Sequence, residues 1–322
     1  MQEIDSNKHA NDFDDEINLR EVFFVLVQGK WIITYVTAFL VTIGIIYSFL
    51  LPNIYQSEAL LAPVDESSSL IGGALSQYSG LAGLAGITLP DGDTGNNSKK
   101  AIELIGSLNF FEKYLMPKIF LPDLMAVEFW DDKNNTIIYD DSIFQKTSNT
   151  WVRNFSYPQK LIPSAQESFE VFKDDHLNIT ENNKTGYVVV SIKHQSPLIA
   201  KQWVQTIVEE VNSFYRQKDK ESSEMAVIYL NKQIAKTSLT EVRQVTASLL
   251  EKEIQKLTLV EANKDYVFEY VYPPSVMEKK SEPIRPLIVI LSFIIGAFLG
   301  MIIVLFRHYF SKEENALDRI SR

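Results

Sequence analysis

The sequence predicts a mixed α+β protein in which two transmembrane helices flank a domain with an α/β base and one very long helix. Three observations lead to this fold class. Two long uncharged apolar runs lie near the two ends of the 322-residue chain, strand-like segments lie between them, and residues 198–272 contain neither glycine nor proline. Since mean hydropathy over the chain is only −0.05, the apolar residues are concentrated in these runs rather than unusually abundant.

The two apolar runs have the length of membrane spans. Residues 31–51 form 21 uncharged positions, and residues 287–306 form 20. At 1.5 Å per residue each covers ~30 Å, the thickness of the hydrocarbon core of a bilayer. Thirty residues precede the first run, with a group of acidic residues among them. This arrangement is unlike a cleaved signal peptide, so we predict a retained signal anchor.

Basic residues predict the orientation of the spans. Arg20 and Lys30 lie within fifteen residues before the first run, and no basic residue follows it at similar distance. Because positive residues favour the cytoplasmic side, we expect cytoplasmic tails over 1–30 and 307–322. Residues 52–286 are then an extracytoplasmic domain, which is periplasmic in a bacterial inner-membrane protein.

Two segments that adjoin the spans have strand-like patterns. Residues 55–64 and 265–272 are rich in apolar, aromatic or β-branched side chains. Because both begin or end close to the membrane, we expect them to share one sheet. Residues 177–180 and 187–193 are predicted to form a hairpin around the turn residues 183–186.

The segments between these strands are predicted to be short helices and a glycine-rich stretch. Residues 67–95 contain seven glycines. Ser98 is predicted to cap a helix that ends before Pro117, and Ser164 to open a helix that runs through Phe172.

A single long helix is predicted over residues 197–262. Ser196 is a favourable N-cap residue and Pro197 a favourable first helical residue. An unbroken helix of this length would reach about 100 Å. Two sites of interruption remain open: a break near 219–223, and a kink or distal tip at 237–240.

Apolar residues recur along the long helix at intervals of three to five positions. A stripe this narrow buries little within its own domain, and identical chains are the simplest source of neighbouring helices. We therefore predict a homo-oligomer. The predicted packing stripe consists of Val227, Leu230, Ile234, Val242, Val245, Leu249, Ile254 and Leu257.

The sequence offers little that resembles a catalytic, cofactor or metal site. It contains no cysteine, and its four histidines have no second ligand one helical turn away. We expect the histidines in surface or capping roles. The net charge of −10 argues against a nucleic-acid partner.

Residues 91–95 resemble a calcium loop only poorly. Three acidic pairs are expected in solvated loops, at Asp131-Asp132, Asp140-Asp141 and Asp174-Asp175. Four aromatic residues either pack in a core or stack on sugar rings: Phe129, Trp130, Tyr139 and Trp151.

The second apolar run contains a glycine motif typical of packed membrane helices. Gly296 and Gly300 lie one helical turn apart, which allows another helix backbone to approach closely. We predict that this face packs against the first span or against a neighbouring subunit. The alternative is that both glycines face lipid.

These features together resemble the Wzz family, the polysaccharide co-polymerases that regulate O-antigen chain length. The resemblance rests on Asp15–Glu21 before the Gly29–Trp31 membrane entry, on Ser281–Pro286 before the second span, and on the glycine pair and the long helix. It covers nearly the full chain, although Asn18 stands where the family often has an acidic residue. By this resemblance, four residues of the chain are assigned to transmembrane packing and oligomerisation: Pro283, Pro286, Gly296 and Gly300.

The resemblance implies a non-enzymatic ring of identical subunits, commonly an octamer, in the bacterial inner membrane. It implies action with the Wzy polymerase on undecaprenyl-diphosphate-linked O units, without a cofactor. Direct contact with the lipid-linked polysaccharide stays open. Three alternatives also stay open: a co-polymerase for capsule or exopolysaccharide that works with a separate tyrosine kinase, a two-span sensor, and a carbohydrate-active enzyme. The sixteen-residue C-terminal tail is too short for an ATP-binding or transmitter domain of its own.

Overall fold

The computed structural model describes residues 19–64 and 94–320. The glycine-rich stretch expected at 67–95 falls almost entirely outside these residues. The chain divides into two units: Asn53–Ser281 form one, and the segments on either side of it form the other. Along the sequence, helices and strands follow one another between the two long apolar helices, so the predicted fold class is confirmed.

The unit built from the two ends of the chain is helical. It contains α1 (Leu19–Gln28), α2 (Lys30–Leu50) and α10 (Arg285–Ile320). The helices α2 and α10 are long and apolar enough to cross a membrane, and only 17% of the most apolar window in each is buried. A core helix of a soluble protein would be mostly buried, so these exposed apolar side chains fit a lipid environment better. The helix α10 continues well beyond the predicted span, which ended at residue 306.

A four-stranded antiparallel sheet organises the other unit. The strands are β1 (Tyr55–Pro63), β6 (Leu177–Glu181), β7 (Val188–His194) and β8 (Phe268–Tyr272), in the order β6-β7-β1-β8. The first and last strands are therefore neighbours, as predicted. The predicted hairpin is β6–β7, and Gly186 in its turn has a φ of +73°, a conformation that suits glycine.

The main core lies between this sheet and the first half of α8 (Pro197–Lys236). Trp203 and Ile207 of the helix pack with Leu61, Val190 and Phe268 of the sheet, and all five are buried. Each fully buried large apolar side chain contributes about 1.5–3 kcal/mol. This packing makes the first half of α8 an integral part of the domain.

The helical segment after β1 differs from the prediction. The helix α4 (Thr94–Ile105) starts before Ser98, which lies inside it, and it stops at Gly106 rather than continuing toward Pro117. Ser107 instead caps the short helix that follows α4, and its hydroxyl accepts the Phe110 N–H. A serine can cap or occupy a helix interior, so residue type alone did not locate the helix start.

Several short turns follow Ser107 before the next sheet. They are α5 (Leu108–Phe110), a π-turn η2 (Phe111–Leu115), a 3-10 turn η3 (Met116–Lys118) and α6 (Leu121–Met125). The buried rings of Phe110 and Phe111 belong to the main core.

The helix predicted after Ser164 is present as α7 (Ala165–Val171). The Ser164 hydroxyl accepts the Glu167 N–H at 3.2 Å, as an N-cap residue should. A π-turn, η4 (Phe172–His176), then leads into β6.

Two small hairpins between α6 and α7 were not predicted. They are β2–β3 (Val127–Asp131 and Thr136–Tyr139) and β4–β5 (Phe144–Gln145 and Thr150–Trp151). They enclose a second small core of Ala126, Tyr139 and Phe144. Their turns contain Asn135 and Asn149 at positive φ, which asparagine tolerates better than most residues.

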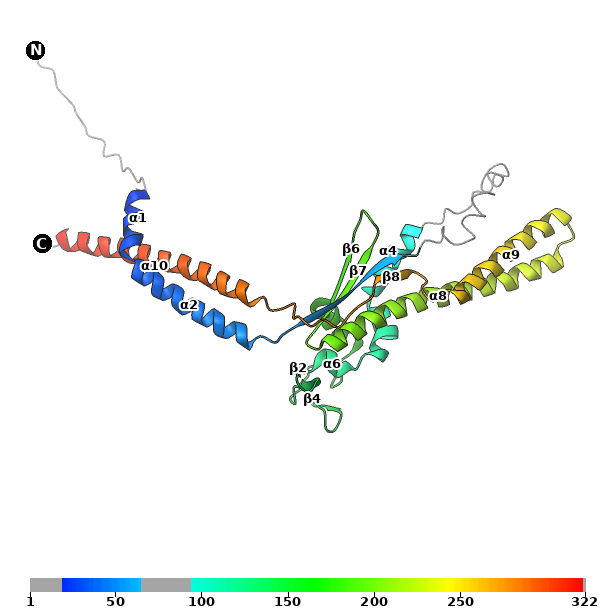
Figure 1. Ribbon diagram of the computed structural model, residues 1–322, viewed down its shortest axis with the longest axis horizontal. Helices are drawn as coiled ribbons and strands as arrows, with labels where there is room; N and C mark the ends of the chain where they lie inside the picture. Colours follow the sequence, from blue (N-terminus) through cyan, green and yellow to red (C-terminus); the bar gives the residue numbers. More distant parts are fainter. Residues whose placement is uncertain (1–18, 65–93, 321–322) are drawn as a thin grey trace, which may run out of the picture. The chain divides into compact units, whose positions relative to one another are not determined.

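The segment predicted as one long helix is a helical hairpin. The helices α8 and α9 (Thr240–Ala262) lie side by side (Figure 1), and Thr237 and Leu239 between them have extended backbone. Residues 237–240 are thus the distal tip, and α8 runs unbroken through residues 219–223. Folding back lets each helix cover part of the other's apolar surface, which one straight helix of about 100 Å does not allow.

Three polar contacts lie at the base of the hairpin. Lys220 bonds to Glu261 at 2.5 Å, the Tyr266 hydroxyl donates to Asp219 at 2.6 Å, and Lys256 lies 4.0 Å from Asp219. The Lys220 and Glu261 side chains are exposed, and water and salt screen such a surface ion pair so that it adds little stability. The alignment of α8 and α9 therefore depends mainly on apolar packing.

A buried asparagine joins α8 to the returning chain. The side-chain amide of Asn212 donates to the Phe268 carbonyl at 2.8 Å, and its oxygen accepts the N–H groups of Val267 and Phe268, each at 2.9 Å.

Asn212→Leu should leave three buried backbone groups without partners. We expect the free energy of unfolding, measured by denaturant titration in detergent, to fall by about 3 kcal/mol. Gln217→Leu, an exposed change on the same helix, should cost less than about 0.5 kcal/mol. Equal losses in the two variants would contradict this role for Asn212.

Candidate functional site

The predicted glycine motif lies where α10 approaches α2. A Cβ atom added at Gly296 would lie 2.9 Å from the Cα atom of Thr37, and one added at Gly300 would lie 2.9 Å from the Cα atom of Ile33. Real Cβ atoms do not approach backbone this closely. The two glycines therefore face the first apolar helix of the same chain, rather than open space.

Two further glycines take part in this contact and were missed by the sequence reasoning. Gly44 of α2 faces Ser292 of α10, and Gly29, which precedes α2, faces Val304. The signal was present in the sequence, because positions 292, 296, 300 and 304 are spaced by four and the first three are small. We call Gly29, Gly44, Ser292, Gly296 and Gly300 the glycine interface.

Packing, rather than hydrogen bonding between helices, accounts for the glycine interface. The hydroxyl of Thr37 donates to the Ile33 carbonyl at 2.7 Å, and that of Ser292 donates to the Ile288 carbonyl at 2.8 Å. Both hydroxyls thus bond within their own helix. Close backbone approach is the main source of contact where no hydrophobic force acts between helices in lipid.

The two predicted prolines lie at the start of α10. Pro286 is the second residue of this helix, a position where the missing N–H costs no hydrogen bond. The Pro283 carbonyl accepts the Arg285 N–H at 3.0 Å. The Arg285 guanidinium lies 4.9 Å from the centre of the Phe49 ring near the end of α2. Pro286 therefore lies in the first turn of the helix and Pro283 two residues before it, and their part in oligomerisation stays a prediction.

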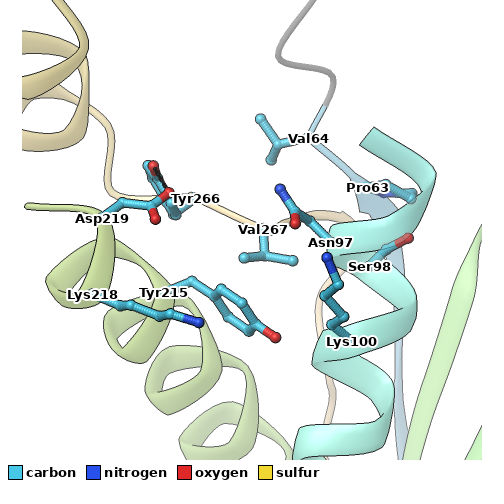
Figure 2. Close-up of a pocket in the computed structure, with 10 residues that line it drawn as sticks. All are labelled: Pro63, Val64, Asn97, Ser98, Lys100, Tyr215, Lys218, Asp219, Tyr266 and Val267. Atoms are coloured by element: carbon cyan, nitrogen blue, oxygen red, sulfur yellow. Dashed lines mark hydrogen bonds between the residues drawn. The ribbon is translucent and has the colours of Figure 1, made fainter. Parts of the chain in front are cut away.

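A cavity of about 110 Å³ opens in the other unit, between α4, α8 and the segment before β8. Figure 2 shows the side chains of Asn97 and Lys100 from α4, with Tyr215 and Lys218 opposite them on α8. The ten residues that line it are Pro63, Val64, Asn97, Ser98, Lys100, Tyr215, Lys218, Asp219, Tyr266 and Val267.

Charged and hydroxyl groups give this cavity a polar lining. The ammonium group of Lys218 lies 5.9 Å from the centre of the Tyr215 ring. Burial raises the pKa of Tyr215, and the negative charges of Asp219 and Glu103 raise it further. Asp219 accepts the hydroxyl of Tyr266. This lining can hold a small polar group by hydrogen bonds.

Two of the histidines lie together beside a tryptophan. His176 and His194 stack with their ring centres 5.7 Å apart, and both contact the Trp203 ring. His194 is only 2% exposed, so of its two predicted roles, surface or capping, the surface role is wrong. The π-turn η4, strand β7 and helix α8 bring these rings together, and no spacing in the sequence indicates it. His9 lies outside the described residues.

Both ring nitrogens of His194 have backbone partners. Its Nε2 lies 2.9 Å from the Asp123 carbonyl, and its Nδ1 accepts the N–H of Ser196, the residue that precedes α8, at 2.9 Å. This pattern requires a neutral ring with the proton on Nε2. Burial is the main reason that the pKa of His194 is lowered to about 4. The neighbouring His176 also has a lowered pKa because of burial, and its Nδ1 lies 2.6 Å from the Lys193 carbonyl.

Two of the predicted acidic pairs and one of the predicted aromatic residues occupy structural positions. Asp131 accepts the N–H groups of Lys133 and Asn134, and Asp140 that of Ser142, which keeps both acidic pairs in turns. Tyr139 is buried, and its hydroxyl donates to Asp123 at 2.6 Å. Across residues 19–64 and 94–320, no three metal-ligating side chains come together.

Comparisons with known proteins agree with the resemblance seen in the sequence. Residues 15–116 match the family model described as Wzz, chain length determinant protein. This match confirms the resemblance and covers the first apolar helix, β1 and the segment through η2. No curated protein matches the chain.

Solved structures of polysaccharide co-polymerases are similar to this chain at low identity. One is a full-length bacterial polysaccharide co-polymerase, with 13% identity, a TM-score of 0.39, and coverage of 92% of this chain and 99% of that one. A fragment of WzzB, a polysaccharide co-polymerase from Salmonella Typhimurium, has 15% identity and a TM-score of 0.28 over 71% of this chain and 100% of its own. A mutant of the Shigella flexneri lipopolysaccharide O-antigen chain-length regulator WzzBSF has 12% identity and a TM-score of 0.26 over the same shares.

Proposed function

We propose that this protein, which carries the chain length determinant segment, is a non-enzymatic regulator of O-antigen chain length. It acts as an oligomeric inner-membrane scaffold with the Wzy polymerase, on undecaprenyl-diphosphate-linked O units. The observation that carries this proposal is the match of residues 15–116 to the Wzz family model. The two apolar helices of the chain support a membrane location.

The proposed topology places both termini in the cytoplasm and the unit Asn53–Ser281 in the periplasm. Arg20 and Lys30 before the first span support this orientation by the positive-inside rule. The polymerase and the lipid-linked chain then meet the protein at or above the outer surface of the inner membrane.

The exposed half of the packing stripe supports assembly into a homo-oligomer. Within one chain, Val227, Leu230, Ile234 and Leu257 are half-buried by the α8–α9 hairpin. The remaining four residues of the stripe are 46–54% exposed: Val242, Val245, Leu249 and Ile254. Val242, Val245 and Leu249 lie along one face of α9, and such a row of exposed apolar side chains favours contact with a like surface on another chain.

We expect the protein in mild detergent to have the mass of several subunits, with an octamer as the proposed state. The double change Val245→Asp and Leu249→Asp should shift the mass toward the monomer, because it places charges in an apolar contact. Gln244→Asp with Ser248→Asp, also exposed positions of α9, is the matched control and should leave the mass unchanged. Mass photometry or light scattering measures this. A monomeric wild-type protein at micromolar concentration would contradict the proposed homo-oligomer.

Profiling of lipopolysaccharide in a deletion strain tests the proposed function. We expect loss of the modal band of chain lengths and its return on expression of the wild-type protein. An unchanged lipopolysaccharide ladder with an altered capsule or exopolysaccharide would instead assign the protein to another polysaccharide. No change in any surface polysaccharide would overturn the proposal.

A further inference from the structure

The segment between β5 and α7 exposes apolar side chains around a sharp turn. Phe155, Tyr157 and Ile162 are 51%, 96% and 58% exposed, and Val152 and Leu161 are also exposed. We call residues 152–162 the apolar loop. Five exposed apolar side chains within eleven residues exceed what isolated surface positions usually show, and such clusters mark contact surfaces.

A partly buried arginine holds the two ends of the apolar loop together. Arg153 Nη2 donates to the Lys160 carbonyl at 2.6 Å, and Nε donates to the Leu161 carbonyl at 3.1 Å. The same guanidinium makes a two-pronged ion pair with Glu167 of α7. The loop is therefore closed at its base by a largely buried side chain, while its apolar residues remain outside.

The charge of this region differs from that of the rest of the chain. From residue 142 to residue 166 the sequence contains no acidic residue and three basic ones, in a chain whose net charge is −10. Arg153 is neutralised by Glu167, whereas Lys146 and Lys160 are exposed. The apolar loop thus combines aromatic and aliphatic side chains with nearby positive charge.

The connection between the first apolar helix and β1 is short. Tyr55 follows the end of α2 by five residues, which span at most about 18 Å. The Tyr55 ring contacts Trp130 of β2 at 5.4 Å. Strand β2 pairs with β3, and separate ring contacts join Tyr139 of β3 to Phe144 at 5.6 Å and Phe144 to Trp151 at 5.3 Å. The apolar loop begins at the next residue.

We propose that the apolar loop lies in the interface of the periplasmic leaflet and contacts anionic lipid headgroups. This inference rests on the membrane placement given under the proposed function. Tyrosine and phenylalanine prefer the interfacial depth of a bilayer, and basic side chains beside them are attracted to anionic lipids. The closed base of the loop keeps these side chains exposed without a large entropic cost on insertion.

A single-cysteine experiment tests this contact, because the chain contains no cysteine. Tyr157→Cys is labelled with an environment-sensitive fluorophore, and the full chain is reconstituted in vesicles of phosphatidylethanolamine and phosphatidylglycerol. We expect blue-shifted emission and roughly twofold quenching by nitroxide-labelled lipids placed at the interface. Met225→Cys on α8, which is 67% exposed, is the matched control and should show neither effect.

A third label separates failure of the loop contact from failure of the membrane placement. Phe298→Cys lies in the apolar part of α10 and is 61% exposed, so nitroxides in the acyl chains should quench it. Quenching at 298 without quenching at 157 would overturn the loop contact and leave the proposed function intact. A blue shift at 157 without lipid quenching would assign the loop to a protein surface, which also overturns the proposal. Absence of quenching at 298 would overturn the membrane placement and the inference together.

A separate variant tests whether the positive charge of Lys160 contributes to the lipid contact. Lys160→Gln should lower the ratio of lipid-contacting to free loop at residue 157 about fivefold, since one basic residue near an anionic surface contributes about that factor to the equilibrium constant. Replacing phosphatidylglycerol by phosphatidylcholine should lower it in the same direction. Lys232→Gln, an exposed change on α8, should have no effect. Equal signals for wild type and Lys160→Gln would contradict an electrostatic contribution from this loop.

Discussion

Gly300→Leu should abolish control of modal chain length while the protein remains in the membrane. The Cα atom of Ile33 occupies the space that a Cβ at this position would need, so α10 must move away from α2. Lipid tails offer no hydrophobic compensation when two packed spans separate. The domain Asn53–Ser281 has its own core and should still fold. The lipopolysaccharide ladder, compared at matched expression, measures the effect.

Two other variants make this prediction specific to the glycine interface. Gly44→Leu, on the opposite helix, faces Ser292 and should produce the same loss of control. Phe298→Leu changes an exposed side chain of α10 and should keep the wild-type ladder. A wild-type ladder in Gly300→Leu and Gly44→Leu would mean that the close packing of the two helices is not needed for function.

The folded protein should lose about 3 kcal/mol of stability between pH 7 and pH 4 through His194 alone. The ring is buried, and its folded pKa is about 4, whereas an unfolded histidine titrates near 6.5. Below about pH 6.5 the unfolded chain binds a proton that the folded chain excludes, so stability falls as the pH drops toward 4. Above about pH 7.5 the ring is neutral in both states and contributes no pH dependence. Denaturant titrations at a series of pH values measure this.

Removal of the titrating group should remove this slope. In His194→Gln, the free energy of unfolding should be lower at neutral pH but should fall less between about pH 6.5 and 4. His176→Gln is the comparison, since His176 faces His194 and lies near Asp175. It should flatten the slope less, because the fall in the pKa of His194 comes mainly from its own burial. Parallel pH profiles for wild type and His194→Gln would contradict this account.

The sequence alone determined the elements whose evidence is local. An uncharged run of about 20 residues is long enough to cross a bilayer wherever it occurs, so both apolar helices were predicted, the first of them nearly to the residue. Ser164 caps α7 because its neighbours in the chain supply the bonded N–H. The strands β1 and β8 were predicted to share a sheet because each adjoins a span in the sequence, and the structure pairs them.

The tertiary structure decided which surfaces meet, because a periodic pattern identifies an apolar face without identifying its partner. The stripe from Val227 to Leu257 was compatible with one long helix or with a hairpin, and only packing of α8 on α9 selects the hairpin. Gly296 and Gly300 were compatible with lipid, a second subunit or the first span, and the structure places them against Thr37 and Ile33. His194 acquires its low pKa from strands and a helix far apart in sequence, so its burial could be seen only once these elements were assembled.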